Sequence, residues 1–302
     1  MVYEIGSFIR DLRIERGYSQ EELCYGICST GNLSKIENGV RMPSRKTIEA
    51  LMQRLGCEDV FLQFSSREEM HQEQLCEEIV MRLSAKDFDG LEAPLKEFEA
   101  SISEGDILNS QYCRFTKAMI NQAKGVSREE VIRELEEALK MTKPGYRKEE
   151  FNLNGLLTYN EIVILINIAN TYAKKDNEKA IEILSGLKQY MDTHILDGQE
   201  RIKKYQVIIF NLSDIMVDEK RYDEAIELCD LGIEDSKVNN RLRLFPYFLA
   251  NKGFALLGKG EEQRAQEQLK KAYHMWDAMD NEKECQRLIQ YSKEKWNLID
   301  LL

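Results

Sequence analysis

Short polar and basic side chains follow one another between residues 29 and 46, and their types suit contacts with a nucleic acid. An asparagine amide can bond to two atoms of one adenine edge, and a lysine can reach guanine or a phosphate. Asn32 and Lys35 stand three residues apart, so one helix would present both on the same side. The residues that could contact bases or phosphates are Gln20, Ser29, Thr30, Asn32, Lys35, Arg41, Ser44, Arg45 and Lys46.

The charge of this stretch is opposite to that of the chain. The 302 residues carry a net charge of −11, which argues against coating of nucleic acid by the whole protein. Residues 1–65 are nearly neutral, with eight basic and nine acidic side chains. Within residues 30–46, however, four cations face only Glu37. The basic concentration therefore coincides with the residues that could contact bases.

Helical spacing and capping signals surround this stretch. Apolar residues recur at helical spacing from Ile5 to Leu12, which predicts a first helix ending near Gly17. Ser19 with Glu22 forms a capping box and predicts a second helix running to about residue 27. A third helix would turn Leu33 and Ile36 inward and end at Gly39, and Ser44 would cap a fourth.

These helices have the order of a helix-turn-helix, in which the second helix of the motif enters the major groove. Thr30, Asn32 and Lys35 would then face bases, while Gln20 would touch the DNA backbone. Three further cations near the start of the next helix, Arg41, Arg45 and Lys46, would reach phosphates. The alternative interpretation is a small helical bundle with a solvated polar face. Gly31 costs helix stability, and it could permit close approach to DNA or mark the helix start.

The pattern of the rest of the chain predicts helical repeats of the tetratricopeptide type. Only four prolines occur in the chain, which favours long helices. Three copies of the repeat pattern occur in residues 165–184, 209–229 and 249–272, and two fainter copies precede them. Residues 282–302 form an amphipathic capping segment. We expect domains at 1–65 and 75–302, joined by a linker at 66–74.

The first helices of stacked repeats line a concave surface that suits an extended peptide. An asparagine amide offers both a donor and an acceptor, so a row of them could hold a peptide backbone. Aromatic side chains could form pockets, and Asp214 or Asp218 could pair with a cationic residue or an amino terminus. The candidate peptide contacts are Asn167, Asn170, Phe210, Asn211, Asp214, Tyr247, Asn251 and Phe254. The alternative is that these asparagines and aromatics belong to the ordinary repeat framework.

Other kinds of site lack a signal in the sequence. The three histidines lie far apart, and no phosphate-binding glycine loop occurs, so we expect no enzyme, no cofactor and no metal site. Seven scattered cysteines are typical of reduced, buried thiols, although a redox sensor stays open. No apolar run is long enough for a bilayer and no signal peptide is evident, which predicts a cytoplasmic protein without membrane contact.

The segment SQEELCYGICSTGNLSKIENG, followed by about five degenerate repeats, resembles the RRNPP peptide-sensing regulators of Gram-positive bacteria. The resemblance implies an all-α fold, with an N-terminal helix-turn-helix bundle followed by a right-handed superhelix of tetratricopeptide repeats and a C-terminal capping helix. It also implies a transcription regulator of quorum-sensing type. Such a protein binds palindromic double-stranded DNA as a homodimer, and a short signalling peptide in the repeat groove controls it.

Two alternative functions stay open at this point. Tetratricopeptide grooves also bind partner proteins, so the chain could be an interaction adaptor. It could also be a constitutive repressor whose repeats only dimerise. Salt-dependent binding to a palindromic DNA would separate the adaptor from the regulator, because phosphate contacts release counterions.

Overall fold

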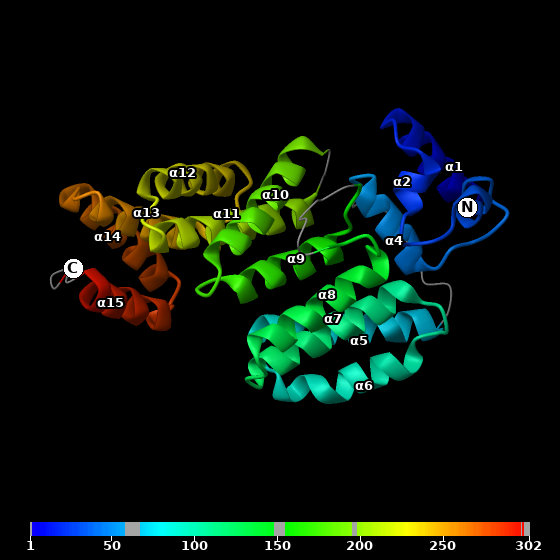
Figure 1. The fold of residues 1–302 in the computed structure, drawn as a ribbon, viewed down its shortest axis with the longest axis horizontal. Coiled ribbons are helices and arrows are strands. Elements are labelled where there is room, and N and C mark those ends of the chain that lie inside the picture. Colours follow the sequence, from blue (N-terminus) through cyan, green and yellow to red (C-terminus); the bar gives the residue numbers. More distant parts are fainter. Residues whose placement is uncertain (1, 58–66, 148–154, 195–197, 297, 299–302) are drawn as a thin grey trace. The chain divides into compact units, whose positions relative to one another are not determined.

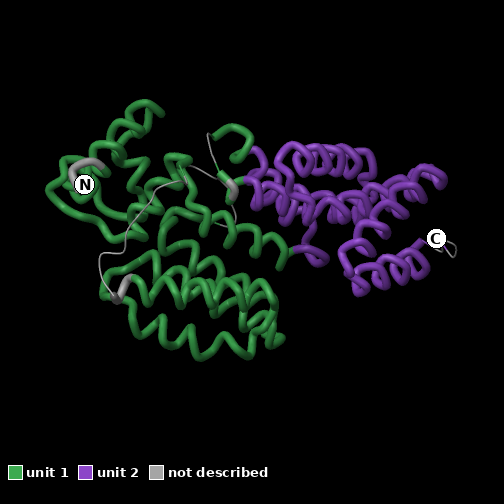
Figure 2. The backbone as a smooth tube through the Cα atoms, turned by 180° about the vertical axis from the view of Figure 1, so that it is seen from behind, with its two compact units in different colours: residues 1–172, 190–201 green, residues 173–189, 202–302 purple. Residues whose placement is uncertain are grey.

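The computed structural model describes residues 2–57, 67–147, 155–194, 198–296 and 298, and the regular elements in these ranges are all helices (Figure 1). The expected all-α fold is therefore confirmed. No helix in the described part of the chain is both long and apolar enough to cross a bilayer. Contacts divide the chain into two compact units, shown in Figure 2. Unit 1 comprises residues 1–172 and 190–201, and unit 2 comprises residues 173–189 and 202–302.

Four helices form the N-terminal bundle of unit 1. They are α1 (Val2–Glu15), α2 (Gln20–Cys24), α3 (Thr30–Glu37) and α4 (Arg45–Arg54). Their apolar faces meet in one core, in which Leu23, Leu33 and Leu51 are completely buried. The helix α2 ends earlier than expected, at Cys24, because the chain turns through Gly26 at a φ of 71°.

The following helices form consecutive pairs. The helices up to residue 172 are α5 (Arg67–Ala85), η1 (Asp89–Leu91), α6 (Glu92–Ser101), α7 (Ile107–Ala123), α8 (Arg128–Thr142) and α9 (Tyr159–Tyr172). The later ones are α10 (Asn177–Thr193), α11 (Gln199–Asp218), α12 (Tyr222–Val238), α13 (Phe245–Gly258), α14 (Glu262–Ala278) and α15 (Glu282–Trp296). The order from α5 to α14 corresponds to the five expected repeats, and α15 follows as the expected capping helix.

The expected linker at 66–74 coincides largely with the first turns of α5. Residues 1–172 also belong to one compact unit, so the helical bundle and the first repeats lie together in it. The division of the chain into domains at residue 65 stays a prediction.

Small residues let the helices of unit 2 approach one another closely. Ala225, Ala265 and Ala272 are completely buried at the repeat positions where the pattern predicts small side chains. A Cβ at Gly253 would lie 2.6 Å from Cγ of Leu269, so α13 and α14 could not pack as they do with a larger residue there. The repeat pattern therefore fixes helix spacing through residue size.

A buried ion pair joins the N-terminal bundle to the repeats within unit 1. Nη2 of Arg54 on α4 lies 3.2 Å from Oε1 of Glu161 on α9, and neither side chain is exposed. Nη1 of Arg54 also donates to the carbonyl oxygens of Leu23 and Tyr25, at 3.0 and 2.6 Å. Oε2 of Glu161 accepts a bond from the backbone N–H of Thr158. The arginine thus connects the turn after α2 to the start of α9.

A second cation, Lys143, lies close to this pair. Its ammonium donates to the carbonyl oxygen of Leu156 at 2.6 Å and lies 5.8 Å from the ring centroid of Tyr25. Burial lowers the pKa of Lys143 to about 8, although the charge of Glu161 acts in the opposite direction. The junction therefore contains two cations and one carboxylate in a region that excludes water.

Candidate functional site

The helix α3 presents the polar face expected of a helix that reads DNA. The hydroxyl of Ser29 accepts a bond from the backbone N–H of Asn32 and caps the helix start. Leu33 and Ile36 point into the core, at 0% and 3% exposure, as the spacing predicts. Thr30, Gly31 and Lys35 are exposed to solvent. Inward apolar residues therefore fix which polar residues face outward.

Asn32 was expected to contact a base, but its amide oxygen already accepts a hydrogen bond within the protein. Nη1 of Arg41 donates to Oδ1 of Asn32 at 2.9 Å. Recognition of adenine by an asparagine amide uses both its oxygen and its nitrogen. While Arg41 holds the oxygen, Asn32 offers only its N–H groups freely. Arg41 and Asn32 therefore act as a pair, which the sequence spacing did not indicate.

Gln20 does not point away from the protein as expected for a contact with the DNA backbone. Its amide donates to Oε2 of Glu37 at 2.7 Å. The same carboxylate accepts bonds of 2.7 and 3.0 Å from Arg13, whose pKa is raised by this hydrogen bonding. Glu37 is only 5% exposed, and a buried carboxylate requires such partners. Gln20 therefore connects α2 to α3 in this structure.

Arg45 and Lys46, expected to reach phosphates, contact carboxylates of the protein instead. Arg45 lies 2.6 Å from Glu49 and 3.8 Å from Glu73, measured from nitrogen to oxygen. Lys46 lies 3.5 Å from Glu49 and 3.3 Å from Glu73. Desolvation works against the charge of Lys46, but these carboxylates outweigh it and raise its pKa. Ser44 caps α4 by accepting a bond from the N–H of Thr47. These charges are therefore partly neutralised within the chain.

The turn between α3 and α4 carries exposed apolar residues that the sequence analysis missed. Val40 is 74% exposed and Met42 is 52% exposed, and both flank Arg41. Apolar contact with the methyl group of thymine is one way in which proteins distinguish bases. Two apolar residues in an otherwise polar turn were the signal available in the sequence.

The candidate peptide contacts of α9 lie in unit 1. The amide nitrogen of Asn167 donates to the carbonyl oxygen of Val163 at 2.8 Å, one turn earlier in the same helix. Asn170 is exposed. The hydroxyl of Thr171 also returns to the α9 backbone, donating to the carbonyl of Asn167. Of the two expected amides on α9, only that of Asn170 is exposed.

The asparagines of unit 2 are also turned toward the protein. Nδ2 of Asn251 donates to the hydroxyl of Ser213 at 3.0 Å, and Asn251 is 7% exposed. Nδ2 of Asn211 is buried without a hydrogen-bond partner among the described residues. The expected row of free amides is therefore not seen, because helix packing uses or covers these groups.

The aromatic candidates pack against other aromatic side chains of unit 2. The ring of Phe254 lies 4.8 Å from that of Tyr291 and 6.2 Å from that of Trp296, and Phe254 is 6% exposed. Phe210 and Tyr247 contact at 5.5 Å between ring centroids. These rings contribute to the core of unit 2, which is the alternative that the sequence left open.

Asp214 keeps an exposed carboxylate next to this aromatic cluster. Desolvation by the surrounding protein, and then the charge of Asp218, raise the pKa of Asp214. The side chain is nevertheless exposed, so water reaches the carboxylate. The carboxylate of Asp218 already forms an ion pair with Lys295, with 2.5 Å between Oδ1 and Nζ. Asp214 is therefore the carboxylate of this pair that stays available to a ligand.

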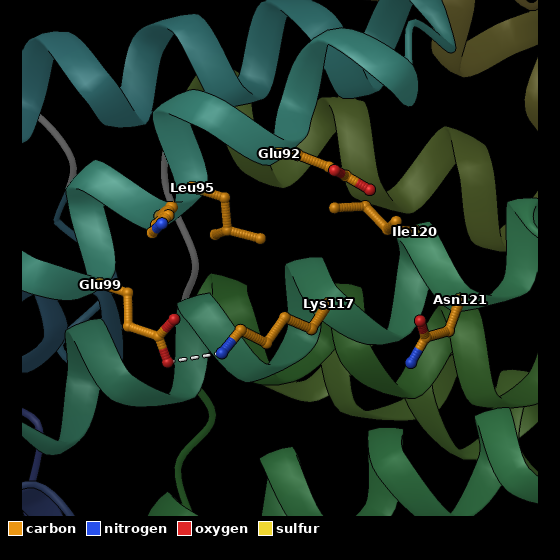
Figure 3. Close-up of a pocket in the computed structure, with 7 residues that line it drawn as sticks. Glu92, Leu95, Glu99, Lys117, Ile120 and Asn121 are labelled. Carbon is orange, nitrogen blue, oxygen red and sulfur yellow. Dashed lines mark hydrogen bonds and ion pairs between the residues drawn. The ribbon is translucent and has the colours of Figure 1, made fainter.

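A small cavity of about 210 Å³ lies between α6 and α7 in unit 1 (Figure 3). Glu99 and Lys117 in its wall form an ion pair at 2.5 Å, drawn as a dashed line. Asn121 donates to Glu134, and Glu92 pairs with Lys124, which lowers the pKa of Glu92. Four of the polar residues that line this cavity therefore already have partners within the protein.

Comparison with known proteins supports both parts of the sequence interpretation. The family model described as Helix-turn-helix matches residues 9–62. Bacillus thuringiensis PlcR in complex with the peptide PapR7 and DNA is similar in fold, with a TM-score of 0.61 and 20% identity over 95% of this chain and 99% of that chain. No curated protein matches the sequence.

Two streptococcal proteins share the fold at lower similarity. ComR from Streptococcus vestibularis, a competence regulator in its apo form, has a TM-score of 0.52 and 15% identity over 96% of this chain and 97% of that chain. The Streptococcus dysgalactiae SHP pheromone receptor Rgg2 has a TM-score of 0.51 and 16% identity over 97% and 99% of the two chains. The chain therefore contains a helix-turn-helix domain at residues 9–62 and shares the fold of PlcR, ComR and Rgg2 over nearly its whole length.

Proposed function

We propose that this protein is a transcription regulator that binds palindromic DNA as a homodimer and is controlled by a short signalling peptide bound to its repeats. The observation that carries the proposal is the exposed face of α3, with Thr30 and Lys35 outward and Leu33 and Ile36 inward. This face belongs to a matched helix-turn-helix domain. The fold of the whole chain is also that of PlcR, which was crystallised with a peptide and DNA.

Dimerisation would place two such helices on one DNA. Two recognition helices must lie about 34–36 Å apart to enter successive major grooves on one face of the duplex. A peptide that favours one separation over another would change DNA affinity, provided that it binds the two states differently. In unit 2 the peptide would contact the exposed carboxylate of Asp214 and would have to release the amide of Asn251, which now bonds within the protein.

Selection from a random DNA library tests the first half of the proposal. We expect wild-type protein to enrich palindromic sequences and to lose affinity steeply as salt rises, because phosphate contacts release counterions. Lys35→Ala should lower affinity for the selected DNA by about 10-fold or more, since one good base contact contributes about 1–3 kcal/mol. Lys283→Ala, an exposed lysine on α15, is the matched control and should leave binding unchanged.

The outcome also separates the two roles open to Lys35. A base contact would relax sequence preference at one position, whereas a phosphate contact would lower the salt slope by about one without changing preference. Absence of any salt-dependent binding to DNA by the folded protein would contradict the proposal and favour an interaction adaptor.

A library of synthetic heptapeptides tests the second half. We expect a subset of peptides to bind the protein and to change its affinity for the selected DNA. Asp214→Asn should weaken binding of those peptides that carry a cationic group, because the exposed carboxylate would be lost. Peptides that bind without any effect on DNA affinity would contradict control by this route.

A further inference from the structure

A groove on unit 2 lies between α12 and α14, with α13 as its floor. Both walls are second helices of their repeats, whereas the candidate peptide contacts in this unit lie on the first helices, α11 and α13. The groove has a volume of about 610 Å³, within the range of about 300–1,000 Å³ found for ligand sites. None of the candidate peptide contacts lines it, so it is distinct from the set of residues proposed for the signalling peptide.

Apolar side chains form part of the lining of this groove. Ile233 of α12, Phe245 and Leu249 of α13, and Met275 of α14 line it. Leu249 is 5% exposed, while the other three are partly accessible. Burial of this accessible apolar surface by a partner would lower the free energy of the complex, because the surface would be removed from water.

The groove also carries an excess of positive charge. Lys237, Lys271 and His274 line it and are exposed, and neither lysine forms an ion pair with a described residue. Lys252 is paired with Asp230, so these two lining residues largely cancel. The lining residues thus carry two lysine charges that no carboxylate of the lining offsets. Their charge favours a partner that carries carboxylates.

Exposed apolar residues of unit 2 collect on the same elements. Its large exposed apolar side chains among the described residues are Leu231, Val238, Leu242 and Met279. Val238 directly follows Lys237 at the end of α12, and Met279 directly follows the last lining residue of α14. The exposed apolar side chains of unit 2 therefore occur on α12, at the end of α14 and in the turn between α12 and α13, the elements next to the groove.

The shape of the groove favours a helix as its occupant. On α14 the lining residues run from Gln268 to Ala278, which corresponds to about 15 Å at 1.5 Å per residue. An additional helix can pack between two neighbouring helices by placing its side-chain ridge in their groove. We propose that this groove binds an acidic amphipathic helix of a partner protein, with apolar side chains on the floor and carboxylates beside Lys237, Lys271 and His274.

A pair of designed peptides tests this inference on the full-length protein. The probe is a fluorescein-labelled helix of about three turns, with leucines on one face and flanking glutamates. The matched peptide has lysines in place of the glutamates. We expect fluorescence anisotropy to show saturable binding of the acidic peptide, weakened by added salt, and at least about tenfold weaker binding of the basic peptide.

Variants locate the binding site. The double variant Lys237→Glu and Lys271→Glu should weaken binding of the acidic peptide by about tenfold or more, because each substitution replaces attraction by repulsion. Lys270→Glu makes the same charge change at the neighbouring exposed position, which does not line the groove, and should have a much smaller effect. Circular dichroism would show that all variants keep their helical content, since the substituted side chains are exposed.

Three results would overturn the inference. The first is absence of binding by the acidic peptide, and the second is equal loss of binding in the Lys270→Glu and Lys271→Glu single variants. The third is a change of oligomeric state in the double variant, measured by light scattering. That result would assign the groove to a second copy of this chain instead of a partner helix.

Discussion

At the scale of single residues, the junction at Arg54, Glu161 and Lys143 shows how the fold controls charge. Arg54 and Glu161 are completely buried, and such pairs stabilise a protein only when their remaining hydrogen bonds are made. Carbonyl oxygens of the turn after α2 and the N–H of Thr158 provide several of those bonds, whereas Nε of Arg54 is buried without a hydrogen-bond partner among the described residues. Lys143 has one carbonyl partner and shares the same carboxylate environment. It is therefore the less favourable of the two cations.

Lys143→Met should change the dependence of stability on pH. Burial lowers the pKa of Lys143 to about 8, below the usual lysine range, so the unfolded chain binds more protons between these values. Wild-type stability should therefore rise relative to the variant as pH increases from 8 toward 10.5, by roughly 3 kcal/mol in total. Below pH 8 the difference should be flat.

Urea unfolding of both proteins across this pH range measures the effect. The difference between them removes contributions from other titrating groups. A difference in unfolding free energy that does not vary between pH 8 and 10 would contradict the lowered pKa.

At the scale of elements, close backbone approach joins the helix-turn-helix bundle to the repeats. The turn after α2 packs directly on the end of α8, and a Cβ at Gly26 would lie 1.8 Å from the carbonyl oxygen of Thr142. Gly17, after α1, has almost the same backbone conformation, with φ of 74° against 71°, but no atom would meet its Cβ within 4 Å. Substitution of each glycine by alanine would therefore distinguish the cost of backbone strain from the cost of overpacking.

Gly26→Ala should destabilise the protein more than Gly17→Ala. Both variants place a side chain in the left-handed region, which costs roughly 1–2 kcal/mol. Gly26→Ala adds overpacking against α8, typically about 1–3 kcal/mol more. Thermal or urea unfolding of the two variants gives the comparison. Equal losses would mean that the contact with Thr142 adjusts without cost.

On α3 we expect the substitution Gly31→Ala to raise stability instead of lowering it. Gly31 is exposed, its φ is not positive, and no atom would meet its Cβ within 4 Å. Alanine should therefore stabilise the helix by up to about 1 kcal/mol. If the glycine permits close approach to DNA, the same variant should bind the selected DNA more weakly. Higher stability with unchanged DNA affinity would show that Gly31 has no role at the DNA.

At the scale of the whole molecule, a chain with a net charge of −11 that binds DNA as proposed would attract it through a small part of its surface. The positive charge of residues 30–46 is lower in the structure than the sequence suggests, because Glu49 and Glu73 pair with Arg45 and Lys46. Glu73 lies on α5, outside the helix-turn-helix match at residues 9–62. A residue beyond the matched helix-turn-helix region therefore influences the charge of that region.

Glu73→Gln should increase affinity for the selected DNA several-fold. The substitution removes the carboxylate that α5 places beside Arg45 and Lys46, so both cations become more available to phosphates. The dependence of affinity on salt should also become steeper. Glu77→Gln, an exposed position one turn later on α5, is the control. Equal affinities of Glu73→Gln and wild type would show that these cations do not contact DNA.

The sequence by itself determined the helices and their inward faces. The capping box of Ser19 and Glu22 is present, with the N–H of Ser19 donating to Glu22 at 2.8 Å, and Leu33 and Ile36 are buried as their spacing predicts. These features depend on residues three or four positions apart, which a pattern can register. The end of α2 was placed too late, because the chain leaves the helix before Gly26, whose φ is positive and which packs against the end of α8.

Only the tertiary structure decided which polar side chains are free. Gln20, Arg45 and Asn251 all stood on faces where a ligand contact was expected. The partners of Gln20 and Asn251 are Glu37 and Ser213, which lie 17 or more positions away in the chain. Arg45 pairs with Glu49 on its own helix, and α5 adds the more distant carboxylate of Glu73. A hydrogen bond depends on which groups meet in space, and a buried polar group must find such a partner. Spacing along one helix identifies a face of that helix, but not the group that another helix places against it.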